Sequence, residues 1–482
     1  MQVPVTRLSE ELSADDTRVI SRPFIPGGEG RVAAIISRVL ALGEAAAALQ
    51  LRAVMERYAA RHKGVEQVFE RHFDQVRDRI ANAGTISVAK RRLMGAYFTM
   101  EYSLESVALF NPSMVFHPDQ SGLAAGEARF IVSLRACGEG HVSSIEFREG
   151  LLDAAGEVHL APMSRFVVTE APREQRRIDK NVFYLKLVEM GVYDTLADRV
   201  LSRLEEYFTL SDLEDVVEAL HWTHNFVERF HHLAEMMLWL ARSSYQVKFP
   251  EDSAISERVI FPVTENESRG IEDARFVRFE SEDGATTYYA TYTAYNGVRA
   301  LSQMIATDDF RTFSMHTLNG ACVQNKGMAL FPRKINDRYV MLARLDGENI
   351  FLLRSESLFF WNESQPLCGP QLPWEFVQVG NCGSPIETSQ GWLVLTHGVG
   401  PMREYRIGAM LLDLDKPDRI IGAMREPLLI PLPEERDGYV PNVVYSCGGV
   451  IHNGRLVLPY AVADSSTRFA TVAVDDLLTA LG

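Results

Sequence analysis

The sequence predicts a mainly β protein with an N-terminal helical extension and a helical insertion. Three observations support this fold class: short apolar runs separated by turn residues from about 248 to 482, 3.6-period apolar patterns in two other segments, and a length of 482 residues. That length is too great for one ordinary single-core domain and short for three. A sandwich, a barrel or a propeller fits the short strands, and their number favours a propeller of about four to six blades over one simple sandwich.

Residues 1–108 form the N-terminal helical region of this prediction. Apolar side chains recur mostly every three or four positions over 32–72, with abundant alanine and no proline, which predicts a helix. We expect a second helix over 73–81 and a third over about 89–108. Short apolar runs broken by Gly and Asp follow, so 109–180 is predicted to be the first part of the propeller.

A second helical segment, 181–247, interrupts the strands as a predicted insertion. The remainder of the propeller, 248–482, follows it and carries most of the catalytic motifs. Exposed apolar stripes on such helices need a partner. We therefore expect the helical regions to narrow the cleft or to form a homo-oligomer, with the run 236–239 in the core rather than at a ligand.

Composition excludes several classes of protein. The formal net charge of −15 disfavours nucleic-acid binding, which needs phosphate-neutralising cations. No stretch reaches the ~18 uninterrupted apolar residues of a membrane span, and the first residues do not resemble a secretory signal, so neither a membrane nor secretion is expected. The five cysteines are few and widely spaced, which favours a reducing cytoplasm. Without C-x-x-C or H-E-x-x-H spacing, no metal site is predicted.

The run from Ser268 to Arg275 holds two adjacent carboxylates, Glu272 and Asp273. In an extended chain they point to opposite faces, so only one can face a cleft floor, while Arg275 lies on the side of Asp273 and can tune its charge. The functional interpretation is a general acid. A turn with a surface ion pair explains the same residues.

Further polar residues stand at predicted strand ends. Cations, a histidine and a tyrosine from different blades would make an anion pocket if the fold brings them together, and would otherwise be solvated side chains: Lys326, Arg344, His397 and Tyr405. Asn111 lies in a Phe-Asn-Pro-Ser-Met run, and Arg135 follows the strand 130–134. Asp464 ends a strand of small and apolar residues, which suits hydrogen bonding to a sugar diol and suits a plain turn nearly as well.

These motifs have an order and spacing across some 300 residues that is far more specific than any one of them. They are Asn-Pro at 111–112, Gly-Ile-Glu-Asp-Ala-Arg at 270–275, Tyr-Thr-Ala-Tyr at 292–295, Leu-Phe-Pro at 330–332, Gly-Trp-Leu-Val-Leu-Thr-His-Gly at 391–398, Tyr-Arg-Ile-Gly-Ala-Met-Leu-Leu-Asp-Leu-Asp-Lys-Pro at 405–417, Pro-Asn-Val-Val at 441–444 and Ala-Asp at 463–464. With them the sequence resembles glycoside hydrolase family 130, the mannoside phosphorylases and related β-mannosidases. The resemblance covers about 110–180 and 250–480 and leaves both helical regions outside.

The resemblance implies a five-bladed β-propeller with the active site at its central axis. It implies an inverting, reversible reaction on short β-mannosides, β-1,2-linked before β-1,4-linked, in which Asp273 is the catalytic acid and acts through a hydroxyl of the bound mannose. Inorganic phosphate, the co-substrate, attacks C1 and releases α-mannose 1-phosphate without any cofactor. Such a displacement needs one acid and room for an external nucleophile, and phosphate needs cations to position it.

Further roles carry over from the resemblance, residue by residue. Phosphate-contacting positions match Lys326, Arg344, His397 and Tyr405, with Gln378 beside them. Mannose-binding positions match Asn111, Arg135 and Asp464, and we assign Glu272 and Arg275 to substrate binding as well.

Two departures from the family pattern leave alternatives open. The phosphorylases usually carry a lysine nineteen residues before the histidine, where this chain has Gln378, and Asn296 stands where the family often has Asp. An inverting β-mannosidase is therefore the second hypothesis, with Glu387 or Glu272 as the base that activates water. A β-mannosyltransferase and a non-catalytic carbohydrate-binding propeller are the others.

Overall fold

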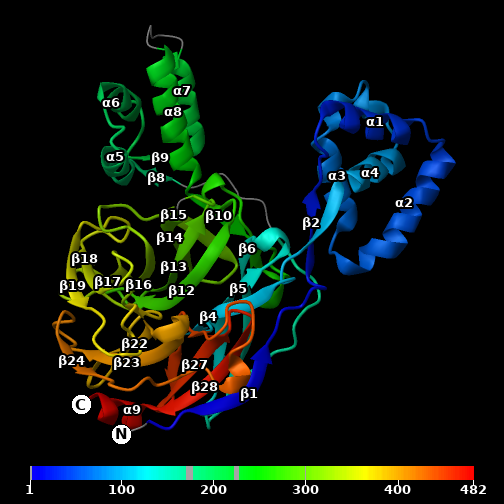
Figure 1. The fold of residues 1–482 in the computed structure, drawn as a ribbon. Helices are drawn as coiled ribbons and strands as arrows, with labels where there is room; N and C mark the ends of the chain where they lie inside the picture. Colours follow the sequence, from blue (N-terminus) through cyan, green and yellow to red (C-terminus); the bar gives the residue numbers. More distant parts are fainter. Residues whose placement is uncertain (1–2, 170–176, 222–226, 299) are drawn as a thin grey trace.

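The computed structural model describes residues 3–169, 177–221, 227–298 and 300–482. Figure 1 shows a body of β-sheets from which two groups of helices project on the same side. The two ends of the chain lie close together at the opposite side of the body, beside α9 (Val474–Leu481). The body is thus mainly β, as predicted.

The largest sheet contains ten strands. It consists of two antiparallel groups of strands that meet where Gly270 pairs in parallel with Ser143. The first group is β4 (Ala108–Phe116), β5 (Ala128–Cys137), β6 (Ser143–Leu152), β7 (Val158–Leu160) and β11 (Val259–Ile260). The second group is β10 (Tyr245–Lys248), β12 (Gly270–Glu280), β13 (Thr286–Tyr295), β14 (Ala300–Thr307) and β15 (Thr312–Thr317).

Three smaller antiparallel sheets complete the body. One is β16 (Lys326–Leu330), β17 (Tyr339–Arg344), β18 (Ile350–Ser355) and β19 (Glu363–Cys368). The next is β20 (Gln378–Asn381), β21 (Ile386–Thr388), β22 (Gly391–Val399), β23 (Tyr405–Leu412) and β24 (Ile420–Ala423). The last is β25 (Val444–Tyr445), β26 (Val450–His452), β27 (Arg455–Val462), β28 (Ser466–Ala473) and β1 (Thr6–Leu12).

The pairing of β1 with β28 corrects one expectation, because 1–108 was predicted to be a helical region. Its helices are also shorter than predicted: α1 (Glu29–Leu40), α2 (Glu44–Tyr58), α3 (Val65–Asp74) and α4 (Val88–Tyr97). The predicted helix over 32–72 is interrupted before α2 by Gly43, and before α3 by Gly64, whose φ of 63° is left-handed. The predicted helix over 89–108 ends at α4, and β3 (Thr99–Ser103) then pairs with β2 (Val19–Pro23).

The second helical group has its own apolar core. It comprises β8 (Ile178–Asp179), α5 (Lys180–Glu189), α6 (Thr195–Leu201), β9 (Tyr207–Phe208), α7 (Leu210–His221) and α8 (Val227–Arg242). Asp179 and Asp194 cap α5 and α6 by accepting hydrogen bonds from backbone N–H groups at the helix starts. Met237 is 0% exposed in this core, as predicted, while Met236, Leu238 and Trp239 line a cavity of about 1320 Å³ between α8 and the turn before β14.

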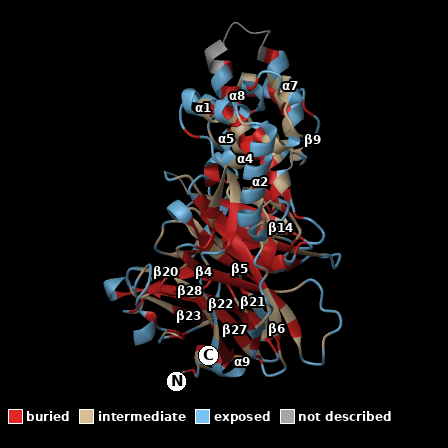
Figure 2. Ribbon diagram, turned by 90° about the vertical axis from the view of Figure 1, so that its right-hand side faces the viewer, coloured by how far each residue is buried: buried red, intermediate tan, exposed pale blue. Residues whose placement is uncertain are grey.

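Buried residues are concentrated in the sheets, whereas the helical groups carry exposed outer surfaces (Figure 2). Within the described ranges, no single helix is long and apolar enough to cross a membrane; only α1 and α2 taken together, as a pair bent by 112°, meet that criterion.

Candidate active site

Three predicted site residues adopt a backbone conformation that is uncommon outside glycine. Asn111, Asp273 and Asp464 have φ values of 51°, 55° and 50°. Asn111 and Asp273 lie at register shifts in β4 and β12, and Asp464 lies in the turn between β27 and β28. Such strained positions persist where the surrounding fold fixes them, and they are common at functional sites.

The bulge in β12 overturns the expectation that Glu272 and Asp273 face opposite sides. Arg135 reaches both carboxylates, because its Nη2 donates to Glu272 Oε1 at 2.8 Å and its Nη1 lies 3.6 Å from Asp273 Oδ1. Asn111 Nδ2 donates to the same Asp273 oxygen at 2.7 Å. Lys326 Nζ donates to the other oxygen of Glu272 at 2.5 Å. The alternation rule failed here because an extra residue in one strand re-aims the side chains that follow it.

Arg275 lies beneath these groups and is 3% exposed. Its Nε donates to the Cys382 carbonyl at 2.9 Å, its Nη1 to the Asp273 carbonyl at 3.2 Å and its Nη2 to the Tyr445 hydroxyl at 2.6 Å. A guanidinium engaged on three sides ties β12 to the sheet of β20 and to the sheet of β25. This geometry favours a role in positioning Asp273 and Tyr445 over the direct substrate contact that the sequence indicated.

The predicted anion-binding residues also come together. Lys326 and Arg344 are direct partners in the β16–β17 pair, and Arg344 Nη1 lies 3.2 Å from His397 Nε2. Since a guanidinium only donates, Nε2 must accept, and we infer that the proton of the neutral ring is on Nδ1. Burial, followed by the charges of Arg344 and Arg275, holds the pKa of His397 well below 6.5, so the imidazole is neutral.

Two aromatic side chains hold His397 in place. Its ring stacks on that of Tyr405 with centroids 5.9 Å apart, and the Tyr445 ring meets it edge-on at 5.0 Å. Gln378 pairs with Val399 on one side of β22, and Tyr405 pairs with Val399 on the other. Because alternate residues of a strand share a face, Gln378, Tyr405 and His397 lie on one face of this sheet.

The two aspartates have opposite pKa shifts. Burial raises the pKa of Asp273, but the nearby cations, Arg135 first among them, lower it more, so that it lies below the ordinary 3.8. Burial, and then the negative charge of Asp273, raise the pKa of Asp464 from 3.8 to about 6. Without a bound anion, Asp273 is therefore ionised, and it must gain a proton before it can act as an acid.

Comparison with known proteins gives the family of this chain. The family model described as β-1,4-mannooligosaccharide phosphorylase, that of glycoside hydrolase family 130, matches residues 223–481. The chain belongs to glycoside hydrolase family 130. The match begins inside the predicted helical insertion and does not include 110–180, where the sequence resemblance was also expected.

Several curated phosphorylases are similar to this chain. The 1,2-β-oligomannan phosphorylase of Thermoanaerobacter sp. is 35% identical over 219 residues, covering 44% of this chain and 72% of that protein. A β-1,2-mannobiose phosphorylase of the same organism is 34% identical and covers 48% and 77%. The solved β-1,2-mannobiose phosphorylase of Listeria innocua gives a TM-score of 0.47 at 20% identity, covering 79% of this chain and 93% of that chain.

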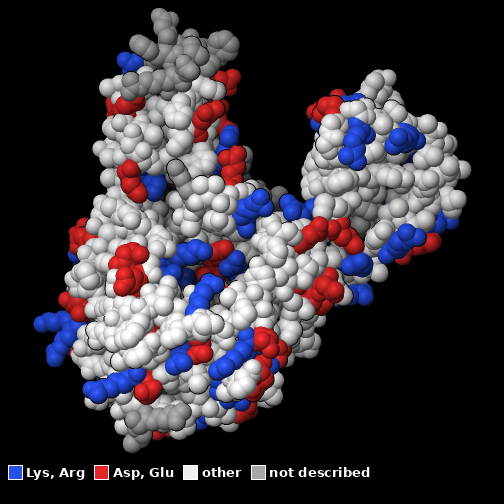
Figure 3. Space-filling model, viewed as in Figure 1, with Lys and Arg blue, Asp and Glu red and all other residues white. Residues whose placement is uncertain are grey.

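Figure 3 shows charged side chains gathered in a hollow of the body. Lys and Arg atoms, with Asp and Glu atoms among them, lie in this hollow between the two helical groups. Among the described residues no group of three or more His, Cys, Asp or Glu side chains could hold a metal ion.

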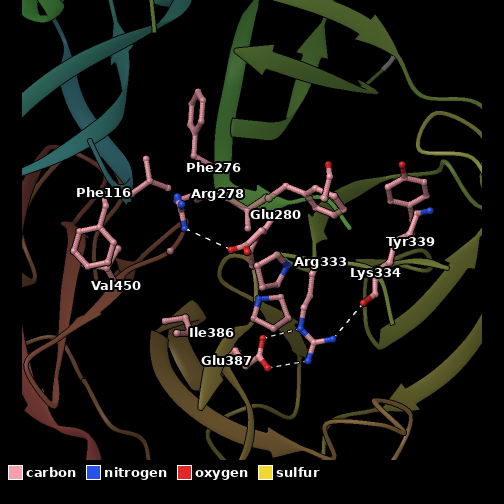
Figure 4. Close-up of a pocket in the computed structure, with 18 of the residues that line it drawn as sticks. Phe116, Phe276, Arg278, Glu280, Arg333, Lys334, Tyr339, Ile386, Glu387 and Val450 are labelled. Carbon is pink, nitrogen blue, oxygen red and sulfur yellow. Dashed lines mark hydrogen bonds and ion pairs between the residues drawn. The ribbon is translucent and has the colours of Figure 1, made fainter. Parts of the chain in front are cut away.

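Glu387, a candidate base for the hydrolase hypothesis, lies elsewhere. It lines a separate cavity of about 1210 Å³ and pairs with Arg333 at 2.8 Å (Figure 4). Its partner on β22 is Trp392, five residues along the strand from His397, or about 17 Å at the rise of an extended chain. Glu387 is therefore not part of the cluster around Asp273.

Sequence reasoning missed Tyr445, which contacts Arg275 and His397. Tyr445 follows directly after the Pro-Asn-Val-Val run that supported the family resemblance, so its position could have been flagged.

Proposed function

We propose that this chain is an inverting β-mannoside phosphorylase. It converts a β-linked manno-oligosaccharide and inorganic phosphate reversibly to α-mannose 1-phosphate and a shortened sugar. The relatives named as phosphorylases of β-1,2-linked mannosides support both this activity and the β-1,2 linkage. The observation that carries the proposal is the location of Asp273 in one network with Lys326, while Arg344 pairs with that lysine across β16 and β17 and contacts His397 of β22.

The site residues divide the work between sugar and phosphate. Asn111, Arg135 and Asp464 surround Asp273 and hold the mannose, while Glu272 orients Arg135 and Lys326. Lys326, Arg344, His397, Tyr405 and Gln378 hold the phosphate. The cations position phosphate for attack on C1. Because phosphate is already an anion, positioning it contributes more to the rate than deprotonating it would.

Phosphate binding itself prepares the acid. Of the three cations that lower the pKa of Asp273, which are Arg135, Arg275 and Lys326, the third also belongs to the proposed phosphate site. A dianion beside Lys326 offsets its charge and raises the pKa of Asp273 toward the working pH. The acid then protonates the leaving oxygen as the C1–O bond breaks and the phosphate–C1 bond forms, and the proton of hydrogen phosphate restores it.

A hydrolase would need a carboxylate that activates water on the face opposite the acid. Glu387 lies in another cavity, and both oxygens of Glu272 are engaged, by Arg135 and Lys326. Glu272 therefore has no carboxylate oxygen free of a cation with which to orient a water molecule. These contacts favour phosphorolysis over hydrolysis in spite of the uncharged Gln378.

We also propose that the body is a five-bladed β-propeller, with 109–180 and 248–482 as its two parts. The first strands of successive sheets are linked around an axis, which supports closure. Phe276 N donates to Ser113 Oγ at 2.9 Å, Asn381 Nδ2 donates to the Gly327 carbonyl at 2.9 Å, and Cys447 N donates to the Pro112 carbonyl at 2.8 Å. The Thr291 hydroxyl donates to the Met328 carbonyl and adds the link from β13 to β16.

The remaining expectations belong to the same proposal. Five unpaired cysteines, four of them buried, support a reducing cytoplasm. The helical groups, which flank the hollow in Figure 3, are proposed to narrow its entrance or to form a homo-oligomer.

Incubation with β-1,2-mannobiose, with and without inorganic phosphate, tests the activity. We expect mannose 1-phosphate, formed as the α anomer, only when phosphate is present. Asp273→Asn should lower kcat by about 10²–10⁴-fold, the usual contribution of a general acid. Asp283→Asn, an exposed acid in the β12–β13 turn, is the matched control and should leave kcat unchanged. Release of free mannose at the same rate without phosphate would contradict the proposal and favour the hydrolase.

A further inference from the structure

The hairpin turn between β22 and β23 carries a strained backbone. Met402 and Arg403 both have left-handed conformations, with φ values of 59° and 57°. Backbone hydrogen bonds close the turn, as Gly400 N donates to the Glu404 carbonyl at 3.0 Å. Two successive non-glycine residues in this region are uncommon and are typical of functional sites.

Arg403 is exposed on this turn and lies over the ring of one site residue, Tyr405. Its guanidinium carbon lies 6.0 Å from the centroid of the Tyr405 ring, within the range of a cation–π contact. Tyr405 in turn stacks on His397, whose Nε2 faces Arg344. The charge of Arg403 also opposes the rise in the pKa of Asp464, which lies in the turn between β27 and β28.

The charge balance of the site leaves room for another cation. Arg135 and Lys326 share Glu272, whereas Arg344 faces the neutral His397. Arg344 is then the one residue of the proposed phosphate site whose positive charge is not shared with the carboxylate of a described residue. A single positive charge does not balance the two negative charges of a phosphate dianion. Arg403 makes no ion pair with any described residue, while Arg406 on the same hairpin is paired with Glu404 at 2.6 Å.

We propose that Arg403 is a phosphate-binding residue that completes the anion pocket of Lys326, Arg344 and His397. This inference rests on the proposed function. Gln378 of β20 and Tyr405 of β23 both pair with Val399 of β22. Arg403, two residues before Tyr405, therefore carries a positive charge near the position where Gln378 is uncharged. Arg403, in the turn before β23, therefore supplies the positive charge that β20 lacks at Gln378.

Three variants test this role. Arg403→Gln should raise the KM for phosphate about tenfold, the loss expected for one charge-assisted contact, with kcat and the KM for mannobiose within about twofold of the native values. Arg406→Gln is the matched control, because alternation turns its side chain to the other face of β23, and it should leave the KM for phosphate unchanged. Adding Gln378→Lys to Arg403→Gln should recover most of the lost phosphate affinity.

Calorimetric titration with inorganic phosphate provides a readout without turnover. We expect weaker binding in Arg403→Gln, native binding in Arg406→Gln and recovery in the double variant. An unchanged affinity for phosphate in Arg403→Gln overturns the inference, and so does a rise confined to the KM for mannobiose, which would assign Arg403 to the sugar. If the native protein cleaves mannobiose without phosphate, the proposed function fails, and the titration still decides whether Arg403 binds the anion.

Discussion

Gly380 lies directly opposite His397 in the β20–β22 pair, and only a hydrogen atom fits between them. A Cβ atom at position 380 would come within 2.5 Å of His397 Cε1 and 2.8 Å of Nε2. The orientation of the imidazole that faces Arg344 thus depends on the absence of a side chain on the neighbouring strand.

Gly380→Ala should displace the imidazole and weaken phosphate binding. Misplacing a reacting or positioning group by about 1 Å can cost about 10²-fold, so we expect the KM for phosphate to rise between tenfold and a hundredfold. Overpacking costs about 1–3 kcal/mol, so the protein should still fold. Gly84→Ala, which meets no atom within 4 Å, is the control. Native phosphate kinetics in Gly380→Ala would show that the ring does not need this space.

Arg275 is expected to be the most costly cation to replace. Arg275→Lys keeps a charge but cannot reproduce three donors in a fixed fork, so buried acceptors in two other sheets lose partners. We expect a loss of about 3–5 kcal/mol in the free energy of unfolding, measured by denaturant titration.

Arg278→Lys provides the comparison for this loss. Arg278 is exposed on the same strand, and its replacement should change the free energy of unfolding by no more than about 0.5 kcal/mol. Equal effects of the two substitutions would mean that Arg275 does not hold the sheets together.

Asp464 should make the protein less stable as the pH rises from about 4 to about 6. Its pKa of about 6 lies above the 3.8 of an ordinary aspartate, so the folded protein binds this proton more tightly than the unfolded chain does. The stabilisation is present below about pH 4 and is lost as the pH passes 6. The uncharged Asn in Asp464→Asn does not undergo this loss. Between pH 4 and pH 7.5 the free energy of unfolding of the variant should therefore rise by about 1–3 kcal/mol relative to that of the native protein.

Denaturant unfolding at the two pH values measures this gain. The variant should bind mannoside more weakly at the same time, because a site residue is held in a destabilised state for its function. Asp308→Asn, an exposed aspartate on the turn after β14, should show no such difference. A parallel pH dependence of the native protein and Asp464→Asn would rule out a raised pKa at this position.

The sequence predicted which residues meet at the site better than it predicted how they are oriented. Asn111, Arg135, Lys326 and His397 were identified by motifs, and strand ends that carry such motifs converge when sheets surround an axis. The local geometry at Glu272 and Asp273 could not be predicted, because alternation assumes a regular strand and nothing in the run announces a bulge.

The apolar periodicity of the sequence also could not predict which distant strands pair or where the helices begin and end. The partner of β1 lies at the far end of the chain, and periodicity within a short strand carries no information about its neighbour. Gly43 and Gly64 could have divided the predicted helix over 32–72, yet isolated glycines are tolerated within helices and do not force a break.

The union of β1 with β28 has a consequence for biosynthesis. During translation Thr6–Leu12 leaves the ribosome long before Ser466–Ala473, so its hydrogen-bonding edge stays open while every other sheet is being made. An unsatisfied edge of this kind invites intermolecular pairing, and a ribosome-bound intermediate of this enzyme is therefore more prone to aggregate than the finished chain.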